Sequence, residues 1–318
     1  MTATARGQFV STVRANVPLC RDHYRLVLSV PEFPPTEPGQ FVQVSCRDVD
    51  EPELVERELA WSTERPPELG DETLLTPGAM LRRPFSLAGR RDVAGGVELD
   101  VIHRVVGIGT DWLSRLSPGN RVGVLGPLGN TFALPPGDAT AILVGGGVGI
   151  PPMLYLVEKL AGKRAVAFCG ALTRDLLPLT VVEDAPPKGA DPTPSIQEFA
   201  RHGIHSVITT DDGSYGFRGF VTQALEQYLD ANRSGSFVVY TCGPEPMMKR
   251  VAEIAAAPGI ECQIAVERAM ACGMGTCQSC CIRVKKPDPS QPPLVGRDWC
   301  YRLACTDGPV FRGCDLLW

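Results

Sequence analysis

The sequence predicts a multidomain protein: an antiparallel β-barrel over residues 1–136, a doubly wound α/β domain over residues 137–266 and a small cysteine-rich domain over residues 267–318. Three observations predict this order. Short β-type runs fill the first part, strands alternate with helices in the second, and seven of the twelve cysteines lie in the third. A chain of 318 residues is long enough to bury the cores of two or three domains.

The overall charge argues against several classes of partner. The chain has 31 basic and 36 acidic residues, a net charge of −5, and no basic cluster, so we expect no binding to nucleic acid. The longest apolar stretch, residues 141–157, contains three consecutive glycines and two prolines and is shorter than the ~20 residues of a membrane span. The N-terminus has no apolar signal region. We therefore expect no membrane span and a cytoplasmic location, where thiols stay reduced.

Six short β-type runs, separated by Pro and Gly, predict the strands of the barrel. They are Phe9–Val13, Tyr24–Val30, Phe41–Ser45, Pro84–Leu87, Val97–Ile102 and Arg121–Leu125. The segment 47–78 interrupts this pattern and is rich in Glu and Pro, which is typical of a surface insertion. The sequence does not indicate a function for it.

Two motifs in the barrel are candidates for binding a phosphate group. Residues 82–86 read Arg-Arg-Pro-Phe-Ser, and an arginine there could pair with a pyrophosphate through two hydrogen bonds. After the strand ending Ile-His-Arg at 102–104, glycines lead to Thr110, which could N-cap a helix and create an anion site. We expect that helix to contain Trp112, Leu113 and Leu116. Each motif is weak alone, because such residues are often solvated strand residues.

The second part begins with a strand, a glycine turn and a helix, which is the context of a nucleotide-binding loop. These are Ala139–Val144, the Gly-Gly-Gly-x-Gly turn, and Met153–Leu160. The turn differs from the G-x-G-x-x-G fingerprint of dinucleotide-binding folds. Further strands are predicted at Ala165–Phe168, His205–Thr209, Phe237–Thr241 and Cys262–Val266, and helices near Ile196–His202, Phe220–Leu229 and Pro246–Ala256. This pattern predicts a five-stranded, mostly parallel sheet, with a proline-rich loop at 181–194.

Ligands of such sheets bind outside the carboxyl ends of the strands. An acidic residue at one end favours NAD over NADP, because a carboxylate binds a free ribose hydroxyl and repels a 2′-phosphate. Asp212 is our candidate for this acidic residue, although an aspartate before a glycine often caps its own turn. Cys242 could be a buried small apolar residue or a thiol close to the nicotinamide. The residues expected to contact the nucleotide are Gly145, Gly146, Gly147, Gly149, Asp212, Cys242, Gly243 and Pro244.

The third part contains the cysteine spacing C-x4-C-x2-C, formed by Cys272, Cys277 and Cys280, with Cys305 25 positions further on. This is the plant-type [2Fe–2S] ligand pattern. The glycines between the first two cysteines allow positive φ angles and close approach of backbone amides to sulfur. Structural zinc, the main alternative, usually uses paired C-x2-C motifs. Cys300 remains an alternative fourth ligand.

The order of these motifs is similar to the ferredoxin–NADP reductase superfamily. The tail narrows the resemblance: residues 267–277 (Glu-Arg-Ala-Met-Ala-Cys-Gly-Met-Gly-Thr-Cys) and 305–311 (Cys-Thr-Asp-Gly-Pro-Val-Phe) resemble the electron-transfer subunit of NAD-dependent bacterial dihydroorotate dehydrogenase. The resemblance covers nearly the whole chain. The long gap between Cys280 and Cys305 and the segments 47–78 and 181–194 depart from it.

The resemblance implies FAD in the barrel, NAD in the α/β domain, a [2Fe–2S] cluster in the tail, and a partner subunit that carries FMN and oxidises dihydroorotate. We expect a hetero-oligomer, specifically a heterotetramer. The residues that match the FAD segments of the family are Arg83, Pro84, Phe85, Ser86, Ile102, His103, Arg104, Gly109 and Thr110. The residues that match its cluster ligands are Cys272, Cys277, Cys280 and Cys305.

The implied activity is electron transfer in pyrimidine biosynthesis, from the partner through the cluster and FAD to NAD. NAD accepts two electrons as a hydride and the cluster carries one, so a flavin between them is required. No general acid or base is then needed in this chain. The alternatives are an NAD(P)H:ferredoxin-type reductase, a diaphorase subunit of a hydrogenase or sulfite reductase, and a zinc-binding adaptor without enzymatic activity.

Overall fold

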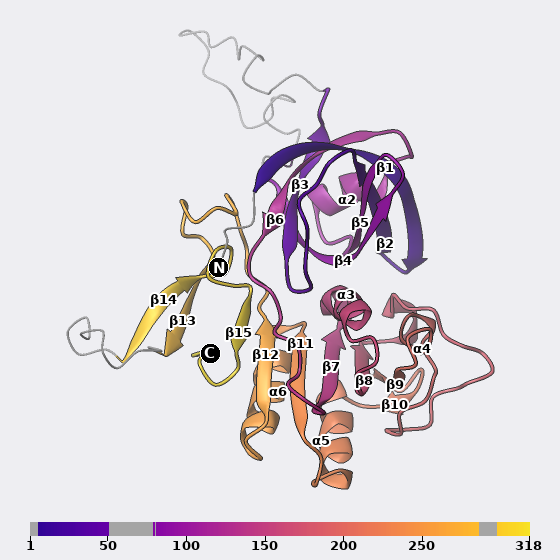
Figure 1. The fold of residues 1–318 in the computed structure, drawn as a ribbon. Helices are drawn as coiled ribbons and strands as arrows, with labels where there is room; N and C mark the ends of the chain where they lie inside the picture. The colour runs from indigo at the N-terminus through magenta and orange to yellow at the C-terminus, as the bar shows by residue number, and fades with distance from the viewer. Residues whose placement is uncertain (1–5, 51–78, 80, 286–297) are drawn as a thin grey trace, which may run out of the picture.

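The computed structural model describes residues 6–50, 79, 81–285 and 298–318. Figure 1 shows a β-barrel, an α/β domain below it and a smaller cysteine-rich region beside both, as the sequence predicts. Residues 51–78 of the expected insertion lie outside the described residues. In the described part of the chain we find no helix with both the length and the apolar character needed to cross a membrane.

The barrel is closed by six antiparallel strands in the order β1-β2-β5-β4-β3-β6, which confirms all six predicted strands. Their bounds are β1 (Gly7–Cys20), β2 (His23–Val30), β3 (Phe41–Asp48), β4 (Arg83–Val93), β5 (Gly96–Arg104) and β6 (Arg121–Leu128). Alternate residues such as Val42 and Val44 point into the barrel core, as expected for strands with one buried face. Helix α2 (Ile108–Ser114) follows β5.

Strand pairing brings the two predicted flavin segments together. In the register of β3 and β4, Gln43 lies opposite Pro84, and in that of β2 and β5, Tyr24 lies opposite His103. Strands β4 and β5 are neighbours, with Leu87 opposite Val101. The motifs that begin β4 and end β5 therefore lie side by side on the barrel wall.

The α/β domain contains a seven-stranded sheet in the order β10-β9-β8-β7-β11-β12-β15. Its strands are β7 (Thr140–Gly146), β8 (Ala165–Ala171), β9 (His205–Thr210), β10 (Phe217–Arg218), β11 (Phe237–Cys242), β12 (Glu261–Ala265) and β15 (Val310–Arg312). The five predicted strands form its parallel centre, but the predicted strand number is wrong. The two-residue β10 extends one edge, and β15, from the cysteine-rich region, pairs antiparallel with β12 at the other.

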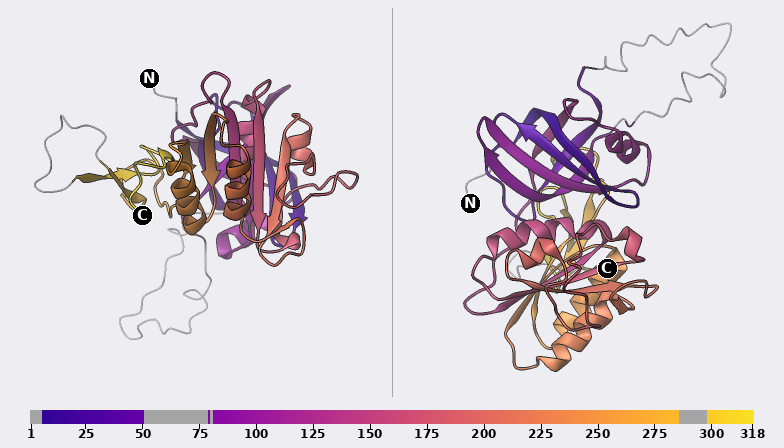
Figure 2. Two further views of the ribbon diagram at one scale, coloured as in Figure 1. Left: turned by 90° about the horizontal axis from the view of Figure 1, so that it is seen from below. Right: turned by 90° about the vertical axis from the view of Figure 1, so that its right-hand side faces the viewer.

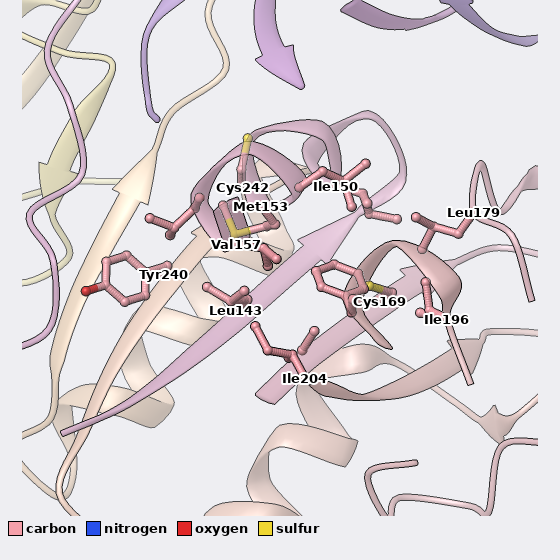
Figure 3. Packing of buried hydrophobic residues seen from close by; sticks show 14 of the residues in the cluster. Leu143, Ile150, Met153, Val157, Cys169, Leu179, Ile196, Ile204, Tyr240 and Cys242 are labelled. Atoms are coloured by element: carbon pink, nitrogen blue, oxygen red, sulfur yellow. The ribbon is translucent and has the colours of Figure 1, made fainter. Parts of the chain in front are cut away.

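Helices cover both faces of this sheet, as Figure 2 shows from two further directions. They are α3 (Pro151–Lys159), α4 (Gln197–Ala200), α5 (Val221–Ala231) and α6 (Glu245–Ala256), with short 3-10 turns η2 (Gly147–Gly149) and η3 (Arg174–Leu176). Along β7, Leu143 belongs to the core on the side of α3 and Val144 to the core on the side of α5 and α6. Figure 3 shows Met153 and Val157 of α3 packed over Leu143.

Helix α3 also joins the α/β domain to the barrel. The Tyr155 hydroxyl donates to the Thr36 carbonyl at 2.8 Å. The side-chain hydroxyls of Tyr155 and Thr36 are also buried and lie 2.8 Å apart. Lys159 forms an ion pair with Glu37 at 3.0 Å. The helix that follows the glycine turn is therefore fixed against the barrel.

The cysteine-rich region begins with the loop 267–280 and continues into a two-stranded ribbon, β13 (Cys281–Lys285) and β14 (Trp299–Leu303). Cys280 and Cys305 are part of the same apolar core as Phe41 and Leu128 of the barrel. The three regions thus share buried contacts, and the predicted boundaries at 136/137 and 266/267 stay predictions.

Candidate functional site

The first part of the candidate site is the wall of the barrel where β4 begins. A Cβ added to Gly109 would lie 3.3 Å from the Arg83 Nε atom and 3.1 Å from the Cys46 sulfur. Arg83 also donates to the Leu81 carbonyl at 2.8 Å. Two predicted segments separated by more than 20 residues therefore meet, and glycine at 109 allows the close approach.

Thr110 does not N-cap the helix, so that prediction is wrong. The helix begins earlier, at Ile108, and Thr110 is its third residue. From there its hydroxyl reaches back and accepts from the amides of Val106 and Gly107 at 2.9 and 3.2 Å. The hydroxyl still satisfies amides at the helix start, but from inside the first turn. The helix ends at Ser114, so Leu116 lies beyond it.

His103 is buried, with 1% of its surface exposed, so it is not a strand residue facing water. Its ring stacks on Tyr24 with a centroid distance of 5.8 Å, and the Phe85 ring lies 5.9 Å away. Burial, with a smaller effect of His23, lowers the pKa of His103 to about 4. The imidazole is therefore neutral near pH 7.

Several buried polar atoms on this wall have no hydrogen-bond partner among the described residues. They are both ring nitrogens of His103 and the Nε atoms of Arg82 and Arg104. Leaving a buried donor or acceptor unpaired costs about 1–3 kcal/mol, so such groups usually have a partner in the working protein. A polar cofactor with phosphates and ring heteroatoms would provide partners for them. The residues present therefore fit FAD.

The second part of the site is the glycine turn after β7. Cys242 at the end of β11 pairs with Gly145 of β7, and a Cβ at Gly149 would overlap the Cys242 carbonyl. A Cβ at Gly146 would lie 3.2 Å from the Pro244 ring. The structure thus brings together two of the three strand ends that were assigned to the nucleotide from the sequence. Glycine is required here because backbone packs on backbone.

Cys242 is 7% exposed, and burial, with a smaller effect of Glu267, raises the pKa of its thiol to about 12. The thiol is therefore protonated at neutral pH. It lies at the carboxyl end of β11, beside the glycine turn, which agrees with the predicted position next to the nucleotide and with the alternative of a buried small side chain.

Asp212 caps its own turn. Its carboxylate accepts from the Ser214 amide at 2.9 Å, and hydrogen bonds with Ser214 lower its pKa. The neighbouring residue, Asp211, was not among the predicted residues, and its pKa is raised by burial and by Asp212. The Asp211 carboxylate has no partner among the residues that the structure describes, and its backbone amide donates to Ala171 of β8 at 3.1 Å. The Asp211 carboxylate thus keeps both oxygens available, whereas one Asp212 oxygen already accepts from Ser214.

The third part of the site is the loop that carries three predicted cluster ligands. The Cys272 sulfur accepts from the amides of Met274 and Cys277 at 3.5 and 3.4 Å. Gly273 and Gly275 have φ angles of 71° and 89°, in the left-handed region that glycine favours. The loop therefore directs its amides toward a sulfur, as the cluster hypothesis requires.

Cys305, rather than Cys300, approaches this loop. Cys305 is 1% exposed, and its thiol interacts with the Cys280 thiol and the Gly275 amide, whereas Cys300 lies on β14 opposite Val284. Burial, followed by the Cys280 interaction, raises the pKa of Cys305 to about 12. Among the described residues, no three His, Cys, Asp or Glu side chains are placed to hold one metal ion. A [2Fe–2S] cluster instead divides four thiolates between two irons.

The comparisons with known proteins agree with this geometry. Residues 267–317 match the family model described as the iron-sulfur cluster binding domain of dihydroorotate dehydrogenase B. A relative from Geobacillus sp. (strain WCH70) is 32% identical over 312 residues, covering 96% of this chain and 97% of its own. One from Geobacillus thermodenitrificans is 34% identical over 286 residues, covering 88% of this chain and 87% of its own. Both are named "Dihydroorotate dehydrogenase B (NAD(+)), electron transfer subunit".

Solved structures extend the likeness to the whole fold. The structure of an NADH-dependent reduced ferredoxin-NADP oxidoreductase aligns with a TM-score of 0.66 and 25% identity, covering 100% of this chain and 92% of that one. A cytochrome P450 reductase from Amycolatopsis aligns with a TM-score of 0.58 and 22% identity, covering 82% and 68% of the two chains, and shows the fold alone. From its similarity to relatives along nearly its full length, the chain belongs to the family of electron transfer subunits of dihydroorotate dehydrogenase B (NAD(+)).

Proposed function

We propose that this chain transfers electrons between NAD and a partner subunit that carries FMN and oxidises dihydroorotate, in pyrimidine biosynthesis. The observation that supports this most strongly is the placement of the cysteine loop. Its backbone contacts β3, the strand paired with the Arg-Pro-Phe-Ser segment of β4. A chain with these neighbours can connect a one-electron centre to a flavin, and the relatives' name supports NAD as the other reactant.

Three sets of residues would hold the cofactors. For FAD they are Arg83, Pro84, Phe85, Ser86, Ile102, His103, Arg104, Gly109 and Thr110. For NAD they are Gly145, Gly146, Gly147, Gly149, Cys242, Gly243 and Pro244, with Asp211 added to Asp212. For the [2Fe–2S] cluster they are Cys272, Cys277, Cys280 and Cys305. When bound, FAD supplies the conversion between two-electron and one-electron chemistry.

The chain itself contributes binding, orientation and exclusion of water. Arg83 would pair with the pyrophosphate, and Gly149 allows close packing at the nucleotide turn. His103, held neutral by burial, can donate one hydrogen bond and accept another. The loop amides around Cys272 would tune the potential of the cluster by hydrogen bonding to sulfur.

The partner assignment is tested by separating the two half-reactions. The purified chain should reduce an artificial acceptor with NADH, whereas reduction of NAD by dihydroorotate should require the FMN-containing partner. Oxidation of dihydroorotate by the chain alone would contradict the proposal. Co-purification with a different redox enzyme, such as a hydrogenase subunit, would support one of the alternative reductases. Light scattering of the complex tests the expected heterotetramer.

The fourth ligand is tested by a matched pair of variants. Cys305→Ser should remove most of the bound iron and the electron paramagnetic resonance signal of the reduced protein, because a buried ligand is lost. Cys300→Ser should retain both, since Cys300 lies on the ribbon opposite Val284. The reverse result would assign the fourth position to Cys300.

A further inference from the structure

Gln43 is a buried polar residue at the junction of the barrel and the cysteine loop. It lies on β3 with 0% of its surface exposed, and its register partner is Pro84, in the predicted flavin segment. Its neighbours on the strand, Val42 and Val44, point into the barrel core. Because side chains alternate along a strand, Gln43 points outward, away from that core.

On its outward side, Gln43 contacts the loop residues on both sides of Cys272. Its Nε2 atom donates to the Ala271 carbonyl at 3.4 Å. A Cβ added to Gly273 would lie 2.7 Å from the Gln43 Oε1 atom and 3.1 Å from Leu128. One side chain therefore touches the loop beside the first predicted cluster ligand while sitting opposite the flavin segment.

The other end of this amide has no partner. The Gln43 Oε1 atom is buried and accepts no hydrogen bond from the residues that the structure describes. Exchanging the two amide ends would place the Gln43 oxygen against the Ala271 carbonyl, which cannot donate, so the orientation with Nε2 toward Ala271 is the one that forms a hydrogen bond. A leucine or methionine would fill this position without an unpaired polar group, so filling space alone does not explain a glutamine.

We propose that Gln43 is a positioning residue that fixes the cluster loop at a set distance from the flavin strand. This inference rests on the proposed function, because it presumes a cluster and a flavin. The contact with Ala271 restrains the loop just before Cys272, and the close approach to Gly273 restrains it just after. Reacting groups need supports that hold them to within about 0.5 Å, and a buried side chain of fixed length is such a support.

Gln40 provides a matched control on the same barrel. It is also buried, with 4% exposed, but both ends of its amide are paired: Nε2 donates to the Gly129 carbonyl at 3.2 Å, and Oε1 accepts from the Glu37 amide at 2.9 Å. Neither contact involves the loop 267–280. Replacing Gln40 therefore tests the general cost of losing a buried glutamine from this barrel.

The experiment compares Gln43→Met and Gln40→Met in the assembled protein, under anaerobic conditions. Methionine keeps the length of the side chain and removes both polar groups. We expect Gln43→Met to keep FAD and its rate of reduction by NADH within about twofold of the unmodified chain, while the cluster is reduced about tenfold more slowly afterwards. We also expect a changed paramagnetic resonance spectrum or lower iron content. Gln40→Met should leave the cluster signal unchanged.

The outcomes separate this inference from the proposed function. If the unmodified chain has no cluster signal, the proposed function fails. If it has one and Gln43→Met shows the same spectrum, iron content and reduction rate, only the role of Gln43 is wrong. Equal effects of the two methionine variants would also overturn it. If Gln43→Met does not accumulate, Gln43→Glu keeps the size but loses the donor to Ala271, and an unaltered cluster in that variant would overturn the inference.

Discussion

The barrel wall and the nucleotide turn differ in how their polar groups are satisfied. On the wall, His103, Arg104 and Arg82 keep buried nitrogen atoms without partners in the described chain. At the nucleotide side, the Asp212 carboxylate accepts from Ser214 and backbone packs on backbone at Gly149. The unpaired buried atoms of the described strands β9 and β11 are two neutral hydroxyls, those of Thr209 and Thr241, and an unpaired hydroxyl costs less than an unpaired charged group. Unpaired buried groups are costly unless a ligand is always present. The difference indicates a resident cofactor on the wall and an exchanging ligand at the turn, as expected for FAD and NAD.

Removing FAD should therefore loosen the wall much more than removing the nucleotide loosens the turn. A ligand held at 1,000 times its dissociation constant stabilises the protein by about 4 kcal/mol. We expect amide hydrogen exchange in β4 and β5 to increase up to about 10³-fold in the flavin-free protein. Exchange in Gly147–Gly149 and α3 should slow by a much smaller factor when NADH is added. Equal loosening at both sites would remove the distinction.

The burial of His103 predicts a pH dependence in the flavin-free protein. The unfolded chain takes up a proton below pH 6.5, whereas the folded chain resists it until about pH 4. Stability should therefore fall as the pH drops from 6.5 to 4, with a loss of about 3 kcal/mol from this residue. Urea unfolding of the unmodified chain and of His103→Gln, compared over that range, isolates the effect. Parallel stability curves for the two would contradict it.

Two glycines of the nucleotide turn should respond differently to the same substitution. Gly149→Ala would force a Cβ against the Cys242 carbonyl and should cost about 2 kcal/mol of stability. NADH binding should weaken with it. Gly147→Ala meets no atom within 4 Å but keeps a φ of 53°, which costs about 1 kcal/mol. Thermal unfolding and NADH titration of both variants measure this. A larger loss in Gly147→Ala would show that strain, not packing, shapes the turn.

The smallest expected effect concerns nucleotide choice. Asp211→Asn removes an unpaired carboxylate at the end of β9 and should raise the NADPH-to-NADH affinity ratio about tenfold, or about 1.4 kcal/mol. Asp212→Asn keeps an oxygen that can accept from Ser214 and should change the ratio less. Titrations with both nucleotides provide the comparison. A larger change of the affinity ratio in the Asp212 variant would support Asp212, the residue predicted from the sequence, as the one that contacts the ribose.

Much of the fold could be predicted because it follows local patterns. The barrel strands and the five parallel strands are short β-type runs that can be recognised in the sequence. The cysteine spacing is itself a local signal. What could not be predicted depends on distant contacts. Strand β15 has three residues, which is too short to be recognised from the sequence, and it forms only by pairing with β12.

The candidate site shows the same division. The strand ends around Gly145 and Cys242 were predictable, because the topology of a parallel sheet places them together. The N-cap role predicted for Thr110 was wrong because a hydroxyl can accept from the free amides at a helix start either from the N-cap position or from within the first turn. Asp212 and Asp211 are adjacent in sequence, and only the turn geometry distinguishes them. The contact of Gln43 with Ala271 joins residues 228 positions apart and has no sequence signal.

Strand β15 has one more consequence, for solubility. Without it, β12 would be the outer strand of the sheet and would expose unpaired backbone groups, a common template for aggregation. Pairing of Gln263, Ile264 and Ala265 with residues 310–312 covers that edge. The Gly313 amide extends the cover by donating to the Cys262 carbonyl at 2.7 Å. The segment after Cys305 thus protects the nucleotide-binding sheet, and damage to the iron–sulfur region would promote self-association of the entire subunit.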